Sequence, residues 1–412
     1  MKKRLQFSIL FLILTVGAFS QNPPKFGIEF SGYVKTDVLW DSRQTSAIRE
    51  GHFLLFPLNE LPDAHGEDIN AVPNFNMLSI QTRLHGKIFG PDALGAKTSG
   101  VIEGEFFGHS DGDINGFRLR HAFVKLNWDH SQLLVGQYWH PLFITTSFPE
   151  VVSFNTGAPF LPFSRNPQIA FTQNVGDIGV TLTAISQRDF VSYGPEGGSS
   201  KYLRNAGLPA LNLKLEFQTE NKEQGTAFQA GISGNYQVLK PRLVTNNNFK
   251  TNNTTSGLIG LAYFKVKVPE LTIKAMGIYG QDMFNLTMLG GYAVKEINPI
   301  TDEEKYTPYT TLSVWTDLQT NGTKWQFGLF GGYSKNLGTT DNIVGAKYVR
   351  GADIAYLYRI SPRVIYNTGR FRFAPEIEYT VAAYGNSQSD GTVTNEKEIG
   401  NLRLLLGIYY FF

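Results

Sequence analysis

Charged residues recur at every second position in three consecutive segments of the chain. Glu103 and Glu105 alternate with apolar residues, as do Arg118 and Arg120 one segment later, and Arg83 one segment earlier. A period of two places such residues on one face of a β-strand. Segments that follow one another in sequence usually lie side by side in space. We therefore expect these arginines and glutamates to share one polar surface.

Two interpretations of this polar surface remain open. Opposed charges across a narrow aqueous passage would create a transverse field that selects which solutes pass. Alternatively, the same residues form salt bridges that only satisfy the inner wall of a barrel. The alternation slips in phase between Arg120 and Lys125, which predicts a β-bulge or the rim of a membrane. The residues expected to line the pore or its constriction are Arg83, Arg118, Arg120, Lys125, Arg165, Glu103, Glu105, Lys35, Asp37, Arg370 and Arg372.

The segment 139–167 is a second candidate, because it is too long for a plain turn and too apolar for an exposed loop. It begins Trp-His-Pro-Leu-Phe and ends Pro-Phe-Leu-Pro-Phe-Ser-Arg-Asn-Pro. A segment of this composition needs to be buried. In a wide barrel it would fold into the lumen and narrow the channel, with Arg165 facing the pore. Contact with a neighbouring subunit is the alternative.

Other chemistry has little support. The chain has no Cys, which excludes disulfides, thiolate metal sites and a cysteine nucleophile. The segment 111–116, Asp-Gly-Asp-Ile-Asn-Gly, resembles the first half of a calcium loop, but Ala122 stands where a bidentate Glu is needed. We favour a hairpin turn there. Ser79, His85 and His121 are the best available catalytic trio, without any nucleophile-elbow or phosphate-loop motif. We predict no enzyme, no metal site and no cofactor.

Long amphipathic strands must carry the charged residues, and the alternation extends over most of the chain. It predicts an all-β, antiparallel transmembrane barrel of about sixteen strands, an even number as bacterial barrels have. The strands are expected near 26–40, 75–89, 99–107, 117–127, 132–138, 168–175, 178–186, 210–219, 226–239, 256–267, 270–280, 307–319, 324–334, 350–360, 370–383 and 398–412.

The predicted connections alternate between long and short. Tight turns fall near 128–130, 176–177 and 320–323. This alternation is expected when turns face the periplasm and loops face the outside. The long connections are 41–74, 139–167, 187–209, 240–255, 281–306, 335–349 and 384–397, with a shorter one at 108–116.

The last predicted strand ends on an aromatic residue. Phe412 is in phase with Tyr410 and Ile408 on one face, whereas Arg403 lies on the other. A C-terminal aromatic in this pattern resembles the signal by which barrel-assembly machinery recognises its clients. We predict that Phe412 and Tyr410 form this assembly signal.

The N-terminus predicts export. Lys2, Lys3 and Arg4 precede a short apolar run, and Ala18-Phe19-Ser20 is a small-x-small cleavage site. Residues 1–20 are therefore interpreted as a signal peptide and 21–412 as one barrel domain. Removing those three residues leaves 34 of the 37 basic residues against 35 acidic ones, so charge indicates no nucleic-acid partner. Charged residues are only 17 %, which suits a wall that contacts lipid.

Several stretches, mainly in the first third of the chain, resemble the DcaP-like branch of trimeric outer-membrane porins. They are Phe30–Asp37, Gln81–Leu84, Phe117–Val124, Leu134–Trp139 and Arg165–Ile169, together with the terminal aromatic strand. The resemblance implies a homotrimer with an inward-folded third loop. It also implies an arginine-lined constriction for small anionic solutes, carried by Arg83, Arg118, Arg120 and Arg165.

We therefore expect a porin in the outer membrane of a Gram-negative cell that passes small hydrophilic solutes by diffusion. Its partners would be outer-membrane lipid and lipopolysaccharide, the barrel-assembly machinery and two further copies of the chain. A substrate-specific channel is the alternative within transport. A barrel enzyme and a loop-mediated adhesin are the alternatives from other classes.

Overall fold

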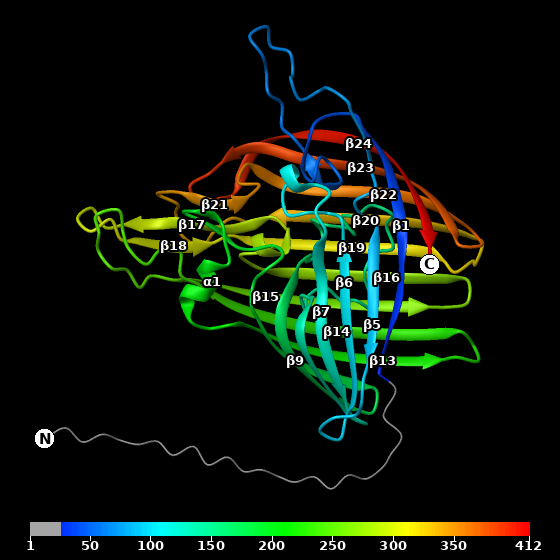
Figure 1. Ribbon diagram of the computed structural model, residues 1–412. Coiled ribbons are helices and arrows are strands. Elements are labelled where there is room, and N and C mark those ends of the chain that lie inside the picture. Colours follow the sequence, from blue (N-terminus) through cyan, green and yellow to red (C-terminus); the bar gives the residue numbers. More distant parts are fainter. Residues whose placement is uncertain (1–25) are drawn as a thin grey trace, which may run out of the picture.

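A computed structural model describes residues 26–412 and shows a closed antiparallel β-barrel (Figure 1). The predicted signal peptide lies outside the described residues. Sixteen strands form the wall, each paired with its neighbours in sequence. They are β1 (Gly27–Asp41), β4 (Asn74–Leu78) continued by β5 (Arg83–Phe89), β6 (Lys97–Glu105), β7 (Arg118–Asn127), β8 (Ser131–Trp139), β9 (Arg165–Val175), β10 (Ile178–Ile185), β13 (Ala210–Asn221), β14 (Thr226–Leu239), β15 (Thr255–Lys267), β16 (Leu271–Gln281), β19 (Thr310–Thr320), β20 (Trp325–Asn336), β22 (Ile354–Thr368), β23 (Phe371–Ser387) and β24 (Val393–Phe411).

The first and last strands close the ring. β1 pairs with β24 in antiparallel register, with Tyr33 opposite Phe411 and Asp41 opposite Arg403. Figure 1 shows the two strands side by side, blue against red. Closure leaves the sheet without a free edge, which is a requirement for strands that cross a membrane. The predicted sixteen-strand barrel is therefore confirmed.

Alternation of side chains explains why these segments form the wall. On β24, Leu402 and Leu404 are exposed on the outer face, whereas Asn401 and Arg403 are fully buried inside. β1 follows the same rule, with Val34 outside and Lys35 inside. The wall is therefore apolar outside and polar inside, the inverse of a soluble protein.

The predicted bulge lies in β7. The register between β6 and β7 shifts between Glu103 and Gly104, so Arg120 has no partner across the pair, between Leu119 and His121. The extra residue turns Arg118, Arg120 and His121 all toward the interior, where each is buried. The phase slip in the sequence thus predicted a feature that concentrates charge inside the barrel.

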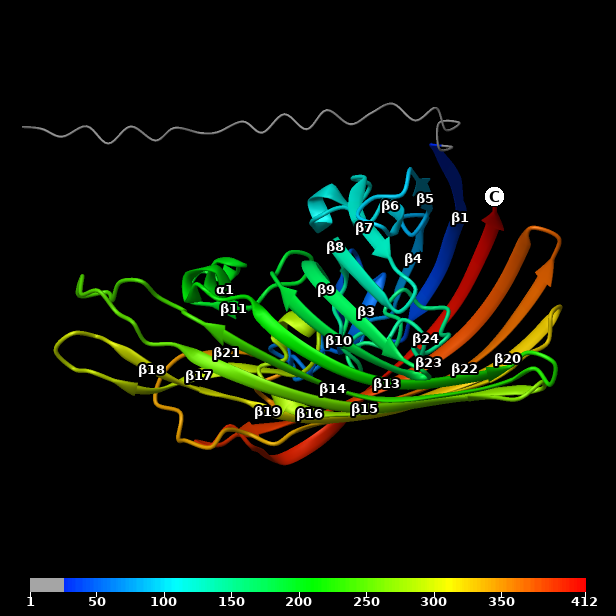
Figure 2. The same ribbon diagram turned by 90° about the horizontal axis from the view of Figure 1, so that it is seen from below.

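The long connections gather at one end of the barrel and the short turns at the other. One end carries α1 (Lys201–Ala206), β11 (Tyr193–Gly194) with β12 (Gly197–Gly198), and the small sheet of β17 (Gly290–Ile297), β18 (Glu304–Pro308) and β21 (Lys347–Arg350). Figure 2 shows these elements together on one side, away from the C-terminus. The regions 281–306 and 335–349 were predicted to be loops, and they instead contain these three strands.

Two long loops fold into the lumen. The third loop, residues 140–164, lies against the inner wall, as predicted from its composition. The first part of the first loop, residues 42–58, also turns inward and forms a hairpin of β2 (Thr45–Ile48) and β3 (Phe53–Pro57), whereas residues 59–73 are mostly exposed. Figure 2 shows β3 inside the curve of the sheet. The two loops share an apolar core with residues of the sixth loop, 282–309, formed by Phe53, Leu142, Phe154, Phe160, Phe163, Leu286 and Met288.

Among residues 26–412, no helix is both long enough and apolar enough to span a membrane.

Candidate functional site

Glu105 is the centre of a buried charge cluster inside the barrel. Its Oε1 accepts hydrogen bonds from Nε and Nη2 of Arg118 at 3.2 and 2.8 Å. Arg120 donates to the other carboxylate oxygen, and Nη1 of Arg165 lies 3.6 Å from Oε1. The side chain of Glu105 is fully buried. Strands β6, β7 and β9 thus bring together four of the residues predicted from the sequence.

Asp189 completes the cluster from a loop that the sequence did not connect to it. It follows β10 and accepts Nη1 of Arg118 at 3.0 Å and Nε of Arg165 at 2.8 Å. Its position in a long connection between strands carries no alternation signal. The contact arises only because this loop folds back over the ends of β7 and β9.

Glu103 and Arg83 form the side of the cluster that faces open space. Glu103 accepts Nε of Arg120 at 2.7 Å and is bonded to Nδ1 of His85 at 3.0 Å. Arg83 forms ion pairs with Glu103 at 3.7 Å and Glu105 at 3.5 Å, without a hydrogen bond to either. Its guanidinium rests over the ring of Tyr33, 5.2 Å from the centroid. Arg83 is therefore less neutralised than the other clustered arginines.

Lys35 and Asp37 were expected to line the pore, but they hold the inward loops instead. Nζ of Lys35 lies 3.0 Å from Asp37 and donates to the carbonyl oxygen of Val152 at 2.9 Å. Nε2 of His52, in the first loop, is 2.8 Å from Asp37. Both β1 side chains are completely covered. The two loops separate them from open lumen, which alternation along β1 alone could not reveal.

The remaining predicted residues have different positions. Arg372 is half-buried and lines the lumen beside Tyr409. Lys125 is half-buried beneath the third loop. Arg370 was expected on the inner wall, but it is exposed in the turn between β22 and β23. The strand β22 extends to Thr368 and leaves only a two-residue turn at this position.

Wall residues from the opposite side fix the third loop across the lumen. Nζ of Lys274 donates to the carbonyl oxygen of Phe148 at 2.9 Å. Asp317 accepts the amide of Glu150 at 3.1 Å. Glu376 accepts the amide of Val152 at 2.6 Å. These contacts come from β16, β19 and β23, so the loop spans from one wall to the other. The loop therefore lies inside the barrel of its own chain.

A cavity of about 480 Å³ lies between this loop and the wall on the short-turn side. It includes Arg83 and Arg120 of the cluster and Arg372 from β23. A second cavity of about 190 Å³ shares Tyr138 and Trp139 with the first and includes Lys125. The lumen beneath the third loop is therefore polar, cationic and lined with aromatic rings.

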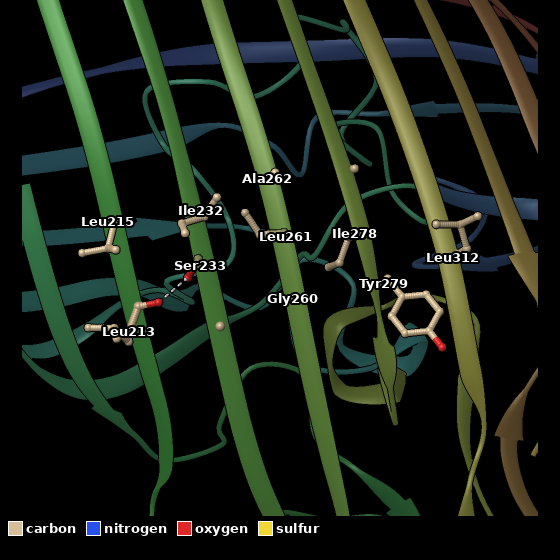
Figure 3. Close-up of a pocket in the computed structure, with 12 residues that line it drawn as sticks. Leu213, Leu215, Ile232, Ser233, Gly260, Leu261, Ala262, Ile278, Tyr279 and Leu312 are labelled. Atoms are coloured by element: carbon tan, nitrogen blue, oxygen red, sulfur yellow. Dashed lines mark hydrogen bonds between the residues drawn. The ribbon is translucent and has the colours of Figure 1, made fainter. Parts of the chain in front are cut away.

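A third hollow, of about 570 Å³, opens on the outside of the barrel (Figure 3). Leu213, Ile232 and Tyr279 are exposed around it. At Gly260 an added Cβ would meet no atom within 4 Å, so the missing side chain leaves the hollow open. Its lining is almost wholly apolar. It belongs to the outer surface and not to the solute site in the lumen.

The alternative chemical sites do not assemble. Ser79 bonds Thr36 at 2.8 Å, whereas His85 bonds Glu103 on the inner face. In the segment 111–116, where a hairpin turn was expected, Asp111–Asp113 form a short 3-10 helix. Asp113 accepts the amide of His109, and Asp111 accepts the amide of Arg49 from the first loop. Across residues 26–412 there is no group of three or more His, Asp or Glu side chains suited to a metal ion.

No family model and no curated protein matches this sequence. Solved structures do resemble it in fold. The outer membrane channel DcaP of Acinetobacter baumannii aligns with a TM-score of 0.67 at 16 % identity, over 94 % of this chain and 97 % of that one. An anion-selective porin from Comamonas acidovorans aligns with a TM-score of 0.54 at 10 % identity, over 94 % and 100 %.

The outer membrane protein OmpT of Vibrio cholerae, in a trimer form, also aligns with a TM-score of 0.54 at 10 % identity, over 94 % and 100 %. The resemblance drawn from the sequence is therefore confirmed at the level of the fold. At these identities it is the barrel, and not a set of side chains, that is shared.

Proposed function

We propose that this chain is an outer-membrane porin that passes small hydrophilic solutes, with a preference for anions. The observation that carries the proposal is a closed barrel whose polar lumen is narrowed by a loop tied to both walls. A lumen lined by fixed charges selects solutes by size and charge.

The proposal includes location and assembly. The chain is exported through a cleaved signal peptide, folded by the barrel-assembly machinery and surrounded by outer-membrane lipid and lipopolysaccharide. Its short turns face the periplasm and its long loops face outward. It assembles as a homotrimer, a state named for one structure of similar fold. It has no catalytic cycle.

A substrate-specific channel is the second candidate. The first, third and sixth loops together bury an apolar core inside the barrel on the long-loop side. Such a core restricts the lumen more than a single loop would. A channel of this kind would conduct weakly and would be blocked by its own substrate.

Purified, folded protein in planar lipid bilayers tests the proposal. We expect stepwise conductance increases and, in a KCl gradient, a reversal potential of the sign that indicates chloride preference. Absence of any ion current would overturn the porin function. Small steps that close on adding one solute class would favour the substrate-specific channel instead.

A further inference from the structure

The cations of the lumen fall into two groups according to their partners. Arg118, Arg120 and Arg165 belong to the first group, and their side chains are only 5, 3 and 1 % exposed. They are matched by three carboxylates, those of Glu103, Glu105 and Asp189, at hydrogen-bond distance. Three positive and three negative charges held this closely largely cancel for an ion in the lumen.

In the second group each cation rests on an aromatic ring and forms no hydrogen bond with a carboxylate. Arg83 lies over Tyr33 at 5.2 Å. It shares Glu103 and Glu105 with the first group at the longer distances of 3.7 and 3.5 Å, and within residues 26–412 its side chain has no hydrogen bond to another side chain. Arg372 lies 5.3 Å from the ring centroid of Phe411 and 5.8 Å from that of Tyr409. Its Nε donates to an uncharged partner, the side chain of Asn367, at 2.9 Å.

Lys125 completes the second group. Its Nζ lies 5.5 Å from the ring of Phe123 and 5.7 Å from that of Tyr138. Within the described chain no carboxylate lies within 4 Å of it or of Arg372. We call Arg83, Arg372 and Lys125 the ring-supported cations.

An aromatic ring orients a cation without removing its charge. The attraction comes from the ring quadrupole, and the ring carries no net charge. The positive charge of Arg372 and Lys125 is therefore uncompensated. Arg83 is the fourth arginine around three carboxylates, so one positive charge remains in excess there as well. Arg83 and Arg372 line the same cavity of about 480 Å³, and Lys125 lines the adjoining one. Guanidinium N–H groups that are not already bonded suit carboxylate and phosphate oxygens.

We infer that the ring-supported cations set the anion preference of the channel and bind anions in transit. Arg118, Arg120 and Arg165 instead hold neighbouring parts of the wall together through their carboxylate partners. This inference rests on the proposed porin function and deepens it, because it assigns selectivity to named residues. The solutes it fits are small oxyanions that pass from one exposed cation to the next. Aromatic support keeps the cations extended into the lumen without neutralising them.

Reversal potentials in a KCl gradient test the assignment. A unit charge about 10 Å away in water changes local ion occupancy roughly twofold, and at about 0.01 M salt screening over that distance is weak. We expect Arg83→Gln, Arg372→Gln and Lys125→Gln each to lower the chloride-to-potassium permeability ratio roughly two- to fourfold. Lys222→Gln, in an exposed turn between β13 and β14, is the matched control and should not change the ratio.

The absence of native cysteine permits a second measurement, in which charge is added to a channel that has already folded and conducts. Arg83→Cys and Arg372→Cys are inserted into the bilayer and then treated with a cationic or an anionic methanethiosulfonate reagent. We expect the cationic reagent to restore chloride preference and the anionic reagent to lower it further. Lys222→Cys should react with both reagents and keep its reversal potential.

The outcomes separate this inference from the function on which it rests. Wild-type protein without current would overturn both. A wild-type current with unchanged selectivity in the Arg83 and Arg372 variants, before and after labelling, would overturn only the assignment. Variants that lose permeability to phosphate or acetate but keep their preference for chloride would support the assignment for oxyanions alone.

Discussion

At the scale of single residues, Glu105 is held by a balance of two large effects. Complete burial disfavours its charged form, and four arginines around it favour that form. Buried ion pairs of this kind contribute little net stability, but removing one partner leaves charges uncompensated. The cluster is therefore better understood as a constraint on geometry than as a source of stability.

We therefore expect Glu105→Gln to destabilise the barrel by about 3–5 kcal/mol, because four guanidinium groups lose their shared carboxylate. Denaturant unfolding in detergent, followed by tryptophan fluorescence, would measure the change. Glu223→Gln, in an exposed turn, is the control and should unfold like the wild type. Equal midpoints for the two variants would show that the cluster is not a structural constraint.

A second prediction at this scale concerns Asp282, at the start of the sixth loop. Burial raises the pKa of Asp282 to about 7, although a hydrogen bond from Gln237 opposes the shift. In the unfolded chain the group loses its proton near pH 4. Between these values the folded state holds the extra proton, so stability falls as pH rises from about 4 to 7 and is level above that.

Hydrogen exchange of the sixth loop would reveal this dependence. After correction for intrinsic rates, amides of 283–289 should be less protected at pH 8 than at pH 5. Asp282→Asn should remove the difference, because the amide does not titrate. Protection that rises with pH in the wild type would contradict the assignment.

Residue positions in the site could be predicted only in part. Arg118, Arg120, Glu103 and Glu105 were identified because alternation along a strand decides which face a side chain occupies. Asp189 was missed because it reaches the cluster through a loop, where spacing carries no such information. Alternation placed Arg83 of β5 on the inner face, but it could not show that Arg83 rests on an aromatic ring, because it gives the face of a side chain and not its partners.

At the scale of elements, two inward loops decide how open the lumen is. Arg359 connects them: its Nη1 donates to the carbonyl oxygen of Ala158 at 2.9 Å, and its Nη2 to that of Leu55 at 3.0 Å. Arg403 donates to Gly51 at 2.7 Å. The loops are thus fastened to β22 and β24 through their backbones, independently of loop side chains.

We expect Arg359→Met to loosen both loops and raise single-channel conductance. Each charge-assisted hydrogen bond lost contributes about 1.5–3 kcal/mol, and methionine preserves much of the apolar stem. Faster hydrogen exchange at 53–56 and 158–160 should accompany the larger conductance. Lys335→Met, exposed on β20, is the control. Conductance at or below that of the wild type would mean that these loops do not limit the channel.

The inward hairpin β2–β3 could have been predicted from its own residues. Phe53-Leu54-Leu55-Phe56 is an apolar run inside a long connection, and all four side chains are buried. The argument that placed 139–167 in the lumen applies to it equally. The strand predicted at 350–360 ends too early, because β22 continues through Pro362 to Thr368.

At the scale of the whole molecule, closure of the barrel could be predicted because it depends on the chain's most regular property. Sixteen alternating segments, with long and short connections in turn, permit only an up-and-down ring. The filled lumen could not be predicted in this way. It depends on contacts between sequence-distant loops and walls, such as Glu376 with Val152.

The final residue joins the two ends of this ring. The amide of Phe412 donates to the carbonyl oxygen of Gly32 at 3.1 Å, and the amide of Gly32 donates back at 3.1 Å. Two hydrogen bonds of about 1 kcal/mol each are a small part of a barrel's stability. The ring of Phe412 is 46 % exposed on the outer face, so it also contributes little packing.

Deletion of Phe412 should therefore slow assembly far more than it destabilises the folded barrel. In cells we expect a reduced fraction of heat-modifiable protein in the outer membrane. Protein refolded from urea into detergent should instead unfold within about 2 kcal/mol of the wild type, since only two backbone hydrogen bonds are lost. Phe412→Tyr keeps the terminal aromatic and should assemble normally. A deletion variant that is as defective in detergent as in cells would show that Phe412 acts through stability and is not an assembly signal.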